Sequence, residues 1–303
     1  MARNKAVAPG AVAAPGGVRA ARRPRQADLL RRFARNRLAV AGAMIVAFLL
    51  LTAALADVIM PHDPTVQNLA ARRQPPNGTY LLGADEFGRD ILSRIILGTR
   101  VALLVSVLAV GIALGLGALI GMIAGFQGGW VDEVLMRLMD ILLAFPYLLV
   151  SIAIVAALGP GVVNTTIAVG IWATPAFARV VRGQVLGLKE REFILAARAI
   201  GVPTPRILWR HLLPNIIAPI LVFSSLYMAN AILLEAALSF LGLGIQPPWP
   251  SWGLMVATGR DFLRVAPHVA TIPGLAIMLA VFGFNLLGDG LRDALDPRLR
   301  NKV

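Results

Sequence analysis

The chain has 303 residues, of which 57% are hydrophobic and 15% charged, with a formal net charge of +13 at pH 7. With a mean hydropathy of +0.74, this composition excludes a disordered chain and argues against a water-soluble globule. It indicates an all-α polytopic membrane protein. Cysteine is absent, which excludes disulfides, thiolate nucleophiles and Cys-based metal sites.

The first 37 residues form a basic tail that is rich in Ala, Gly, Pro and Arg. We expect its first part to be disordered, because it has little apolar surface to bury. Residues 28–37 carry apolar side chains at helical spacing among arginines, which predicts a short interfacial helix on anionic membrane lipid. Nucleic-acid binding is the rival interpretation, and it is disfavoured because an apolar span follows directly.

Six apolar stretches follow the tail and make residues 38–303 a single predicted transmembrane domain. A span needs about 20 residues, and the six predicted spans cover about residues 38–60, 101–126, 134–158, 162–185, 215–240 and 268–287. The first stretch is too long for a signal-peptide core and is expected to remain as an anchor.

The distribution of positive side chains predicts the orientation of these spans. An inner N-terminus places 22 of the 29 Lys and Arg residues inside: ten in residues 1–37, one at Arg137, seven from Arg179 to Arg210, and four from Arg292 to Lys302. The prediction is therefore six spans, N-in and C-in, with the basic loop between spans four and five in the cytoplasm.

A polar segment, residues 61–98, separates the first two spans and contains Leu82-Gly-Ala-Asp-Glu-Phe-Gly-Arg-Asp-Ile-Leu-Ser-Arg94. Arg89, Asp90 and Arg94 would place charges four and five residues apart on a helix at the outer surface. We expect ion pairs to hold this helix in place, and a direct substrate contact is the less favoured alternative.

Glycine and proline define the expected packing of the next two spans. Small residues at four-residue intervals let helix backbones approach closely in lipid, and the second span has two such sets: Gly117, Gly121 and Gly125 on one face, and Gly111 and Gly115 on a neighbouring face. In the third span, Pro146 should kink the helix.

Three polar side chains inside apolar spans are candidates for lining a translocation path: Asp140, Asn230 and Glu235. A carboxylate at the centre of a membrane helix costs about 3 kcal/mol on insertion scales, so Glu235 should face water or a partner. Two interpretations stay open for Glu235: it lines the path, or it pairs with an arginine or a backbone group near the outer interface.

Residues 241–267, between the fifth and sixth spans, are rich in Gly, Pro and Trp. The prolines forbid a simple spanning helix, so we expect an outer re-entrant or surface segment. Trp249 and Trp252 are of a type found at the membrane–water boundary, where we expect both.

A polar and basic stretch joins the fourth and fifth spans, and the rest of the chain is organised around it: Glu192-Phe-Ile-Leu-Ala-Ala-Arg-Ala-Ile-Gly201-Val-Pro-Thr-Pro-Arg-Ile-Leu-Trp-Arg-His-Leu-Leu-Pro214. Residues 190–200 are good helix formers, Gly201 suits a helix C′ position, and Thr204-Pro205 suits a cap followed by the first helical residue. This pattern predicts two short helices meeting at a tight corner, an elbow suited to a cleft on a soluble partner.

Ala196-Ala197, Gly201 and Leu213-Pro214 in this elbow resemble the cytoplasmic coupling loop of permease subunits in binding-protein-dependent ABC importers. By this resemblance the family's glutamate falls at Leu195, and Glu192, one turn earlier, is the candidate to substitute for it. Further stretches are similar to the C-type permeases of dipeptide, oligopeptide and nickel importers: Leu82–Arg94 with Ala84 in place of the usual Thr, Asp140–Pro146, Ala231–Gly244 and Asp289–Arg298.

The resemblance implies a multi-pass permease subunit of a bacterial plasma (inner) membrane. Its expected partners are a second permease subunit in a heterodimer, two ATP-binding subunits and an extracytoplasmic substrate-binding protein. The residues expected to contact the ATPases are Glu192, Ala196, Ala197, Arg198, Gly201, Arg206, Trp209 and Arg210. The expected cargo is a di- or oligopeptide, and nickel or another small solute of the same family is the alternative.

The chain itself is not expected to be an enzyme or to bind a cofactor. Its only lysines, Lys5, Lys189 and Lys302, do not lie in a P-loop, so ATP and Mg²⁺ would bind to the partner ATPases.

The sequence disfavours two other classes of protein. An intramembrane hydrolase could pair Asp140 with Asp289, but the Gly-x-Gly-Asp pattern of such proteases is incomplete at Asp289 and no Gly-x-Ser-x-Gly or His-Glu-x-x-His occurs. A self-sufficient secondary transporter usually has inverted repeats, and none is clear. Proteolysis or uptake by the purified single chain would favour these alternatives.

Overall fold

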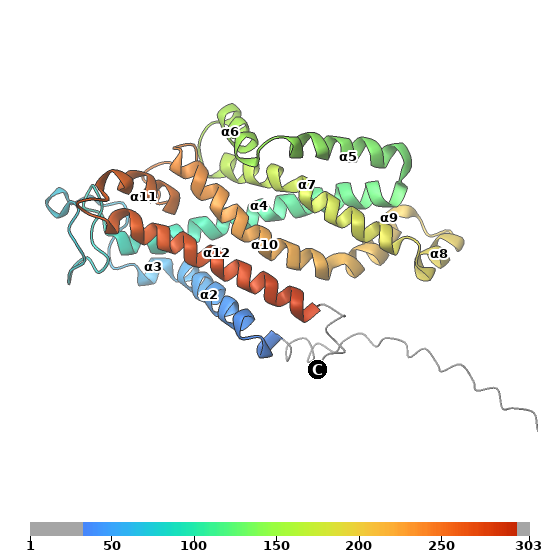
Figure 1. The fold of residues 1–303 in the computed structure, drawn as a ribbon, viewed down its shortest axis with the longest axis horizontal. Coiled ribbons are helices and arrows are strands. Elements are labelled where there is room, and N and C mark those ends of the chain that lie inside the picture. The colour runs from blue at the N-terminus through green and yellow to red at the C-terminus, as the bar shows by residue number, and fades with distance from the viewer. Residues whose placement is uncertain (1–32, 296–303) are drawn as a thin grey trace, which may run out of the picture.

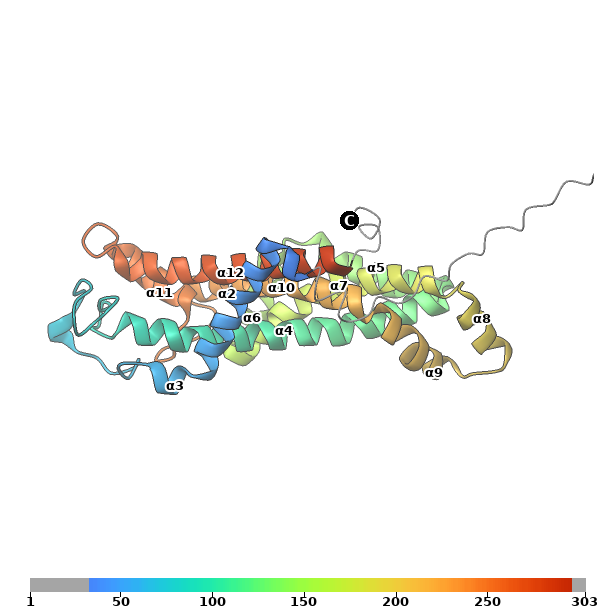
Figure 2. The same cartoon turned by 90° about the horizontal axis from the view of Figure 1, so that it is seen from below.

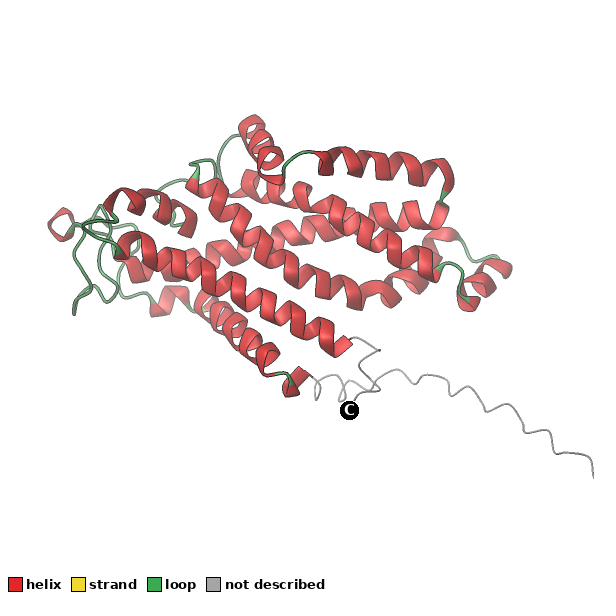
Figure 3. Cartoon of the chain, in the orientation of Figure 1, coloured by secondary structure: helices red, strands yellow, loops and turns green. Residues whose placement is uncertain are grey.

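The computed structural model describes residues 33–295, whose regular secondary structure is helical, as predicted, apart from one isolated bridge between Ala84 and Asp90. Figure 3 shows the helices of this part of the chain in red, joined by loops. Most of the predicted tail and interfacial helix, and the end of the chain after residue 295, lie outside the described residues.

The described helices form an elongated bundle in which most of the long ones run along one axis (Figure 1). Their bounds are α2 Arg37–Ala54, α3 Ala56–Ile59, α4 Ile91–Gln127, α5 Gly129–Ala144, α6 Tyr147–Leu158, α7 Val162–Leu188, α8 Glu192–Ala199, α9 Thr204–Arg206, α10 Leu213–Phe240, α11 Trp252–Gly259 and α12 His268–Leu295. Short 3-10 turns lie at Leu69–Ala71 and Arg260–Phe262, and a π-helical turn at Ile207–Leu212. Figures 1 and 2 place α8 and α9 at one end of the bundle, the α8 end, and α11 with the loop after α3 at the other, the α11 end.

Within residues 33–295, four helical stretches are long and apolar enough to cross a membrane: Arg37–Ala54, Ile91–Gln127, Thr204–Phe240 and His268–Leu295. The pair α5 and α6 would make a fifth span if its two bent halves are counted together. Helix α7 has 27 residues, but Arg179 and Arg182 lower its hydropathy. The number of six spans therefore stays a prediction.

The predicted third span is not one kinked helix but two helices, α5 and α6, that meet at 94°. Pro146 lacks a backbone N–H and disfavours helical geometry in the preceding residue, and Phe145 is extended with φ −94° and ψ 145°. A kink was predicted at the right residue, but the helix ends there altogether.

Helix α4 corrects the prediction of a separate surface helix before the second span. It begins at Ile91, runs for 37 residues and is about 55 Å long, which exceeds a hydrocarbon core of about 30 Å. Asp90 caps it: the carboxylate accepts hydrogen bonds from the backbone N–H groups of Leu92 and Ser93, at 3.3 and 3.2 Å. Arg89 and Asp90 therefore precede the helix instead of lying on it.

The predicted close packing at Gly117, Gly121 and Gly125 is confirmed, because all three lie against α7. A Cβ atom would lie 2.5 Å from Phe177 Cβ at Gly117, and 2.4 Å from the Ala178 carbonyl oxygen at Gly121. Apart from neighbouring residues and the backbone of α4 itself, no atom would lie within 4 Å of a Cβ at Gly111 or Gly115. The first set thus joins α4 to α7, and the second faces open space in the described chain.

A buried ionic network joins the loop before α4 to the bundle at the α11 end. Asp85 Oδ2 lies 2.6 Å from Arg89 Nε and 3.4 Å from Arg94 Nε. Glu86 Oε1 accepts a bond from Arg89 Nη2 at 3.2 Å, and Arg94 Nη1 donates to the Pro64 carbonyl at 2.9 Å. Ion pairs were predicted here, but the carboxylates that pair with the arginines are Asp85 and Glu86.

Glu86 should make the stability of this network depend on pH. Burial first, and then the neighbouring charge of Asp85, raise the pKa of Glu86 above its usual 4.5. The folded state thus binds this proton more tightly than the unfolded state, so stability falls as pH rises from about 4.5 through the raised pKa.

Replacing Glu86→Gln should remove this dependence, so the melting temperature of the variant relative to the wild type should rise with pH across that window. Melting curves of both proteins between about pH 4 and 8 measure the difference. A difference in melting temperature that stayed constant with pH would contradict the assignment of this pH dependence to Glu86.

Of the two tryptophans predicted at the membrane–water boundary, Trp252 is buried instead. Trp249 is 56% exposed, but Trp252 is 1% exposed, and its Nε1 donates to the Ile95 carbonyl of α4 at 3.2 Å. An indole whose N–H already has a backbone partner can be buried at little cost. Trp252 therefore fixes α11 to α4 and does not lie at a surface.

Candidate functional site

The elbow at the α8 end is built around Gly201. Helix α8 ends with two hydrogen bonds: the Val202 N–H donates to the Ala197 carbonyl at 3.0 Å, and the Gly201 N–H donates to the Arg198 carbonyl at 2.9 Å. Gly201 has φ +76°, in the left-handed region that glycine adopts without a side-chain clash. The predicted C′ role of Gly201 is confirmed.

The second arm of the elbow differs from the prediction of a separate helix capped by Thr204. The N-cap is Pro203, with φ −64° and ψ 143°, and α9 continues through the π-helical turn Ile207–Leu212 into α10. Pro214 does not end the helix, since it falls in the first turn of α10. Its missing backbone N–H lies where the hydrogen bonding changes from the π-helical to the α-helical pattern. The elbow is thus joined to the Thr204–Phe240 stretch without a loop.

Most of the predicted contact residues of the elbow are exposed. They are Glu192, Ala196, Arg198, Gly201, Arg206, Trp209 and Arg210. The exception is Ala197, which is 6% exposed and packs into the bundle core together with Ile194 and Ile207. Ala197 therefore seats α8 on the bundle and leaves little surface for another chain.

Large apolar side chains share this exposed surface with the charges. Phe193 is 43%, Leu195 47%, Ile200 81% and Trp209 57% exposed. Leu195, the position at which the family resemblance expects a glutamate, is thus exposed. A mixed apolar and basic surface of this kind is suited to a partner whose cleft offers both apolar and acidic groups.

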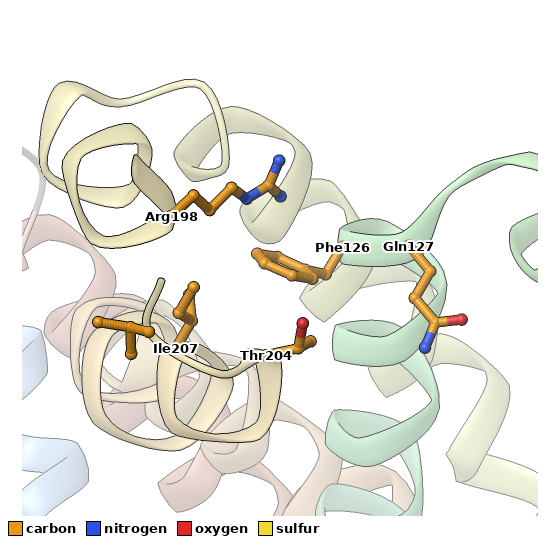
Figure 4. A pocket seen from close by; sticks show the side chains of 6 residues that line it. Phe126, Gln127, Arg198, Thr204 and Ile207 are labelled. Carbon is orange, nitrogen blue, oxygen red and sulfur yellow. The ribbon is translucent and has the colours of Figure 1, made fainter. Parts of the chain in front are cut away.

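An open hollow of about 460 Å³ lies between the elbow and the end of α4 (Figure 4). The residues that line it are Phe126, Gln127, Arg198, Val202, Thr204 and Ile207. The guanidinium carbon of Arg198 lies 4.3 Å from the centre of the Phe126 ring, a cation–π contact worth about 0.5–1 kcal/mol at an exposed site. No sequence signal pointed to Phe126, which lies 72 residues before Arg198.

Two ion pairs connect α5 to α7. Both Nε and Nη2 of Arg182 donate to the Asp132 carboxylate at 2.6 Å, and Arg179 Nη2 donates to Asp140 Oδ1 at 2.6 Å. The side chains of Asp140 and Arg179 remain 46% and 53% exposed. Asp140, a predicted path residue, thus has a charge partner within this chain.

The other two path candidates lie on α10. Glu235 is 1% exposed, and its Oε1 accepts hydrogen bonds from Ser239 Oγ at 2.8 Å and Ser251 Oγ at 2.9 Å. Of the two interpretations of Glu235, the pairing one expected an arginine or a backbone group, and the partners in this chain are two hydroxyl groups instead. Asn230 is exposed, and its Nδ2 donates to the Leu226 carbonyl at 3.3 Å.

The aspartyl pair considered for a hydrolase has no support in this arrangement. Asp140 lies on α5, whereas Asp289 lies on α12, and Figure 1 shows α7 and α10 between these two helices. Asp140 also pairs with Arg179. Two carboxylates must be close together to share a proton.

Comparison with known proteins identifies the family to which this chain belongs. Residues 117–301 match the family described as the binding-protein-dependent transport system inner membrane component, and residues 26–76 match the N-terminal TM domain of oligopeptide transport permease C. The chain belongs to this family of inner-membrane transport permeases, as its sequence motifs predicted.

Curated relatives cover nearly the whole chain. It is 45% identical over 275 residues to the glutathione transport system permease protein GsiD of Pectobacterium atrosepticum, which covers 90% of this chain and 91% of the relative. Identity is also 45% to the dipeptide transport system permease protein DppC of Alkalihalophilus pseudofirmus, over 90% of each chain. For the di/tripeptide transport system permease protein DppC of Pseudomonas aeruginosa it is 45%, over 89% of this chain and 91% of the relative.

Proposed function

We propose that this chain is a membrane subunit of an ATP-driven peptide importer and forms half of its translocation pathway. The observation that carries the proposal is 45% identity, over about nine-tenths of the chain, to permeases named for dipeptides and for glutathione, itself a small peptide. The partners would be a second permease, two ATPase subunits that bind ATP and Mg²⁺, and an extracytoplasmic binding protein. Nickel or another small solute remains the alternative cargo.

In the proposed topology, α7 is a sixth span and both ends of the chain face the cytoplasm. This topology is supported by the start of α2 and the end of α12, which lie together, with Asn36 Nδ2 donating to Asp293 Oδ2 at 3.2 Å. Seven Lys and Arg residues between Arg179 and Arg210 lie in the segment from the second half of α7 to the elbow, as expected for a cytoplasmic side.

The elbow would couple ATP hydrolysis to movement of the pathway. Its exposed face, with Trp209, Arg198 and Arg206, would bind in a cleft of an ATPase subunit. Because α8 follows α7 closely and α9 continues into α10, closure of the ATPases would tilt both helices and change which side of the membrane the pathway opens to.

A valine at Gly201 should abolish most uptake. A residue with a Cβ atom costs about 1–2 kcal/mol in the left-handed region, and a β-branched one is particularly disfavoured there, so α8 would end differently and the docking surface would change shape. The measurements are peptide uptake by the reconstituted complex and copurification of the ATPases.

Gly187→Val is the matched control for this prediction. A Cβ at Gly187, as at Gly201, would meet open space, but Gly187 lies inside α7 with an ordinary backbone conformation, so uptake should persist. Normal uptake and assembly with the Gly201 variant would defeat the docking assignment.

The cargo itself can be tested on the complete transporter. We expect proteoliposomes with all subunits and the binding protein to take up di- or tripeptides with ATP, and this chain alone to take up none. A binding protein that bound chelated nickel and no peptide would contradict the peptide assignment.

A further inference from the structure

Helices α6, α7 and α10 bring five aromatic rings into one continuous cluster. The ring centres of Tyr147 and Trp172 are 5.5 Å apart, and those of Trp172 and Tyr227 are 5.9 Å apart. Tyr227 also contacts Phe223 at 4.6 Å and Phe177 at 5.2 Å. Phe177 is fully buried and Tyr147 is 55% exposed, so the cluster runs from the core of the bundle to its surface.

Two of these rings lie far from the ends of their helices. Tyr227 is at the midpoint of α10, which covers residues 213–240, and Trp172 lies about 15 Å along α7 from its first residue, Val162. If α7 and α10 span the membrane, both rings lie deep within the hydrocarbon layer. Trp and Tyr are usually enriched at the two boundaries of a membrane, where their N–H or O–H group meets water.

Three of the five rings carry a polar group, and none of these groups has a hydrogen-bond partner among the described residues. This holds for Tyr147 Oη, Trp172 Nε1 and Tyr227 Oη, and each of these residues is at least partly exposed. Trp252 provides the contrast within the same chain, since its buried indole N–H donates to Ile95.

An unpaired N–H or O–H that faces lipid costs several kcal/mol, because hydrocarbon offers no acceptor. Three such groups on neighbouring rings, together with the exposed Asn230, three residues after Tyr227 on α10, are therefore more compatible with a water-filled path than with lipid. The aromatic surfaces between them offer contact area to an apolar side chain.

We propose that Tyr147, Trp172 and Tyr227, the aromatic strip, line the translocation path and contact the side chains of the peptide in transit. The inference rests on the proposed function and adds a preference: the strip favours passage of apolar and aromatic side chains, while its O–H and N–H groups bond to peptide amides. Contacts of this kind are individually weak, which is compatible with release.

The absence of cysteine allows a direct test of the path. In the assembled transporter, Trp172→Cys and Tyr227→Cys should react with a charged, water-soluble thiosulfonate, at rates that change with ATP and vanadate. Phe282→Cys is the control, because Phe282 is 54% exposed and lies at the midpoint of α12, as Tyr227 does in α10. Lack of reaction at both test positions in every nucleotide state, or rates equal to the control, would overturn the proposal.

The preference is tested by uptake at saturating loaded binding protein, so that selection by the binding protein does not enter. For Trp172→Leu and Tyr227→Leu, the rate for diphenylalanine relative to dialanine should fall about two- to tenfold, the equivalent of one lost aromatic contact. Tyr227→Phe should keep the ratio, as should the control Phe282→Leu. If the wild type takes up peptides and both leucine variants keep its uptake ratio, the aromatic strip is refuted and the proposed function is not. If the wild type takes up no peptide, the proposed function itself is refuted.

Discussion

Leucine in place of Gly121 should force α4 and α7 apart and leave little stably folded protein. The new Cβ would lie 2.4 Å from the Ala178 carbonyl oxygen and 2.9 Å from Val181 Cβ, and the first of these atoms belongs to the α7 backbone. Overpacking a dense core typically costs 1–3 kcal/mol. Because the backbone of α7 cannot rotate away as a side chain can, we expect a loss of about 3 kcal/mol or more.

Gly115→Leu provides the control for this experiment, since it makes the same change on the same helix with no atom within 4 Å of the new Cβ. The measurements are the melting temperature of the purified chain in detergent and its accumulation in the membrane. If both variants melted at the same temperature as the wild type, close packing at Gly121 could not be what joins the two helices.

Alanine in place of Asp85 should have the second large effect, a loss of about 3–5 kcal/mol, as for breaking a buried ion pair. Asp85 is 3% exposed, and Arg89 and Arg94 are 7% and 2% exposed, so the change would leave two guanidinium groups in the interior with too little negative charge. Asp85 Oδ1 also accepts the backbone N–H groups of Phe87 and Arg89 at 2.9 Å, and these bonds would be lost too. Thermal unfolding and the rate of protease cleavage in residues 61–90 measure the effect.

Asp57→Ala is the comparison for an exposed pair. Asp57 Oδ2 lies 2.9 Å from Arg100 Nη2, but the two side chains are 71% and 34% exposed. Water solvates both charges when such an exposed pair is broken, so the pair contributes little to stability. We expect a much smaller change in stability than for Asp85→Ala. Equal losses in the two variants would show that burial of the network does not matter.

Local patterns predicted the parts of the fold that depend on a few neighbouring residues. Gly201 has the positive φ that its position at the end of a helix required, and the glycines at 117, 121 and 125 lie where two helices touch. The end of α10 was predicted at residue 240, where the structure has it. Backbone sterics and spacing along one helix are enough for such predictions.

Local patterns were not enough where a distant segment provided a partner. Trp252 was predicted to lie at the membrane boundary, but the carbonyl of Ile95 on α4 accepts a hydrogen bond from its indole N–H inside the bundle. No local pattern pointed to Ser251 as a partner of Glu235, since it lies 16 residues further on and provides one of the two hydroxyl donors to that carboxylate. At the elbow, Ala197 belonged to the expected contact set, and the bundle core covers it instead.

By itself, the sequence determined an all-helical membrane protein, its transport family and the position of the elbow, because composition, helical periodicity and short motifs are properties of neighbouring residues. Only the tertiary structure decided which polar groups are buried together, that the third apolar stretch divides into two helices, and that Tyr147, Trp172 and Tyr227 meet. The physical reason is that burial and hydrogen bonding depend on contacts between segments far apart in the chain, which no local pattern encodes.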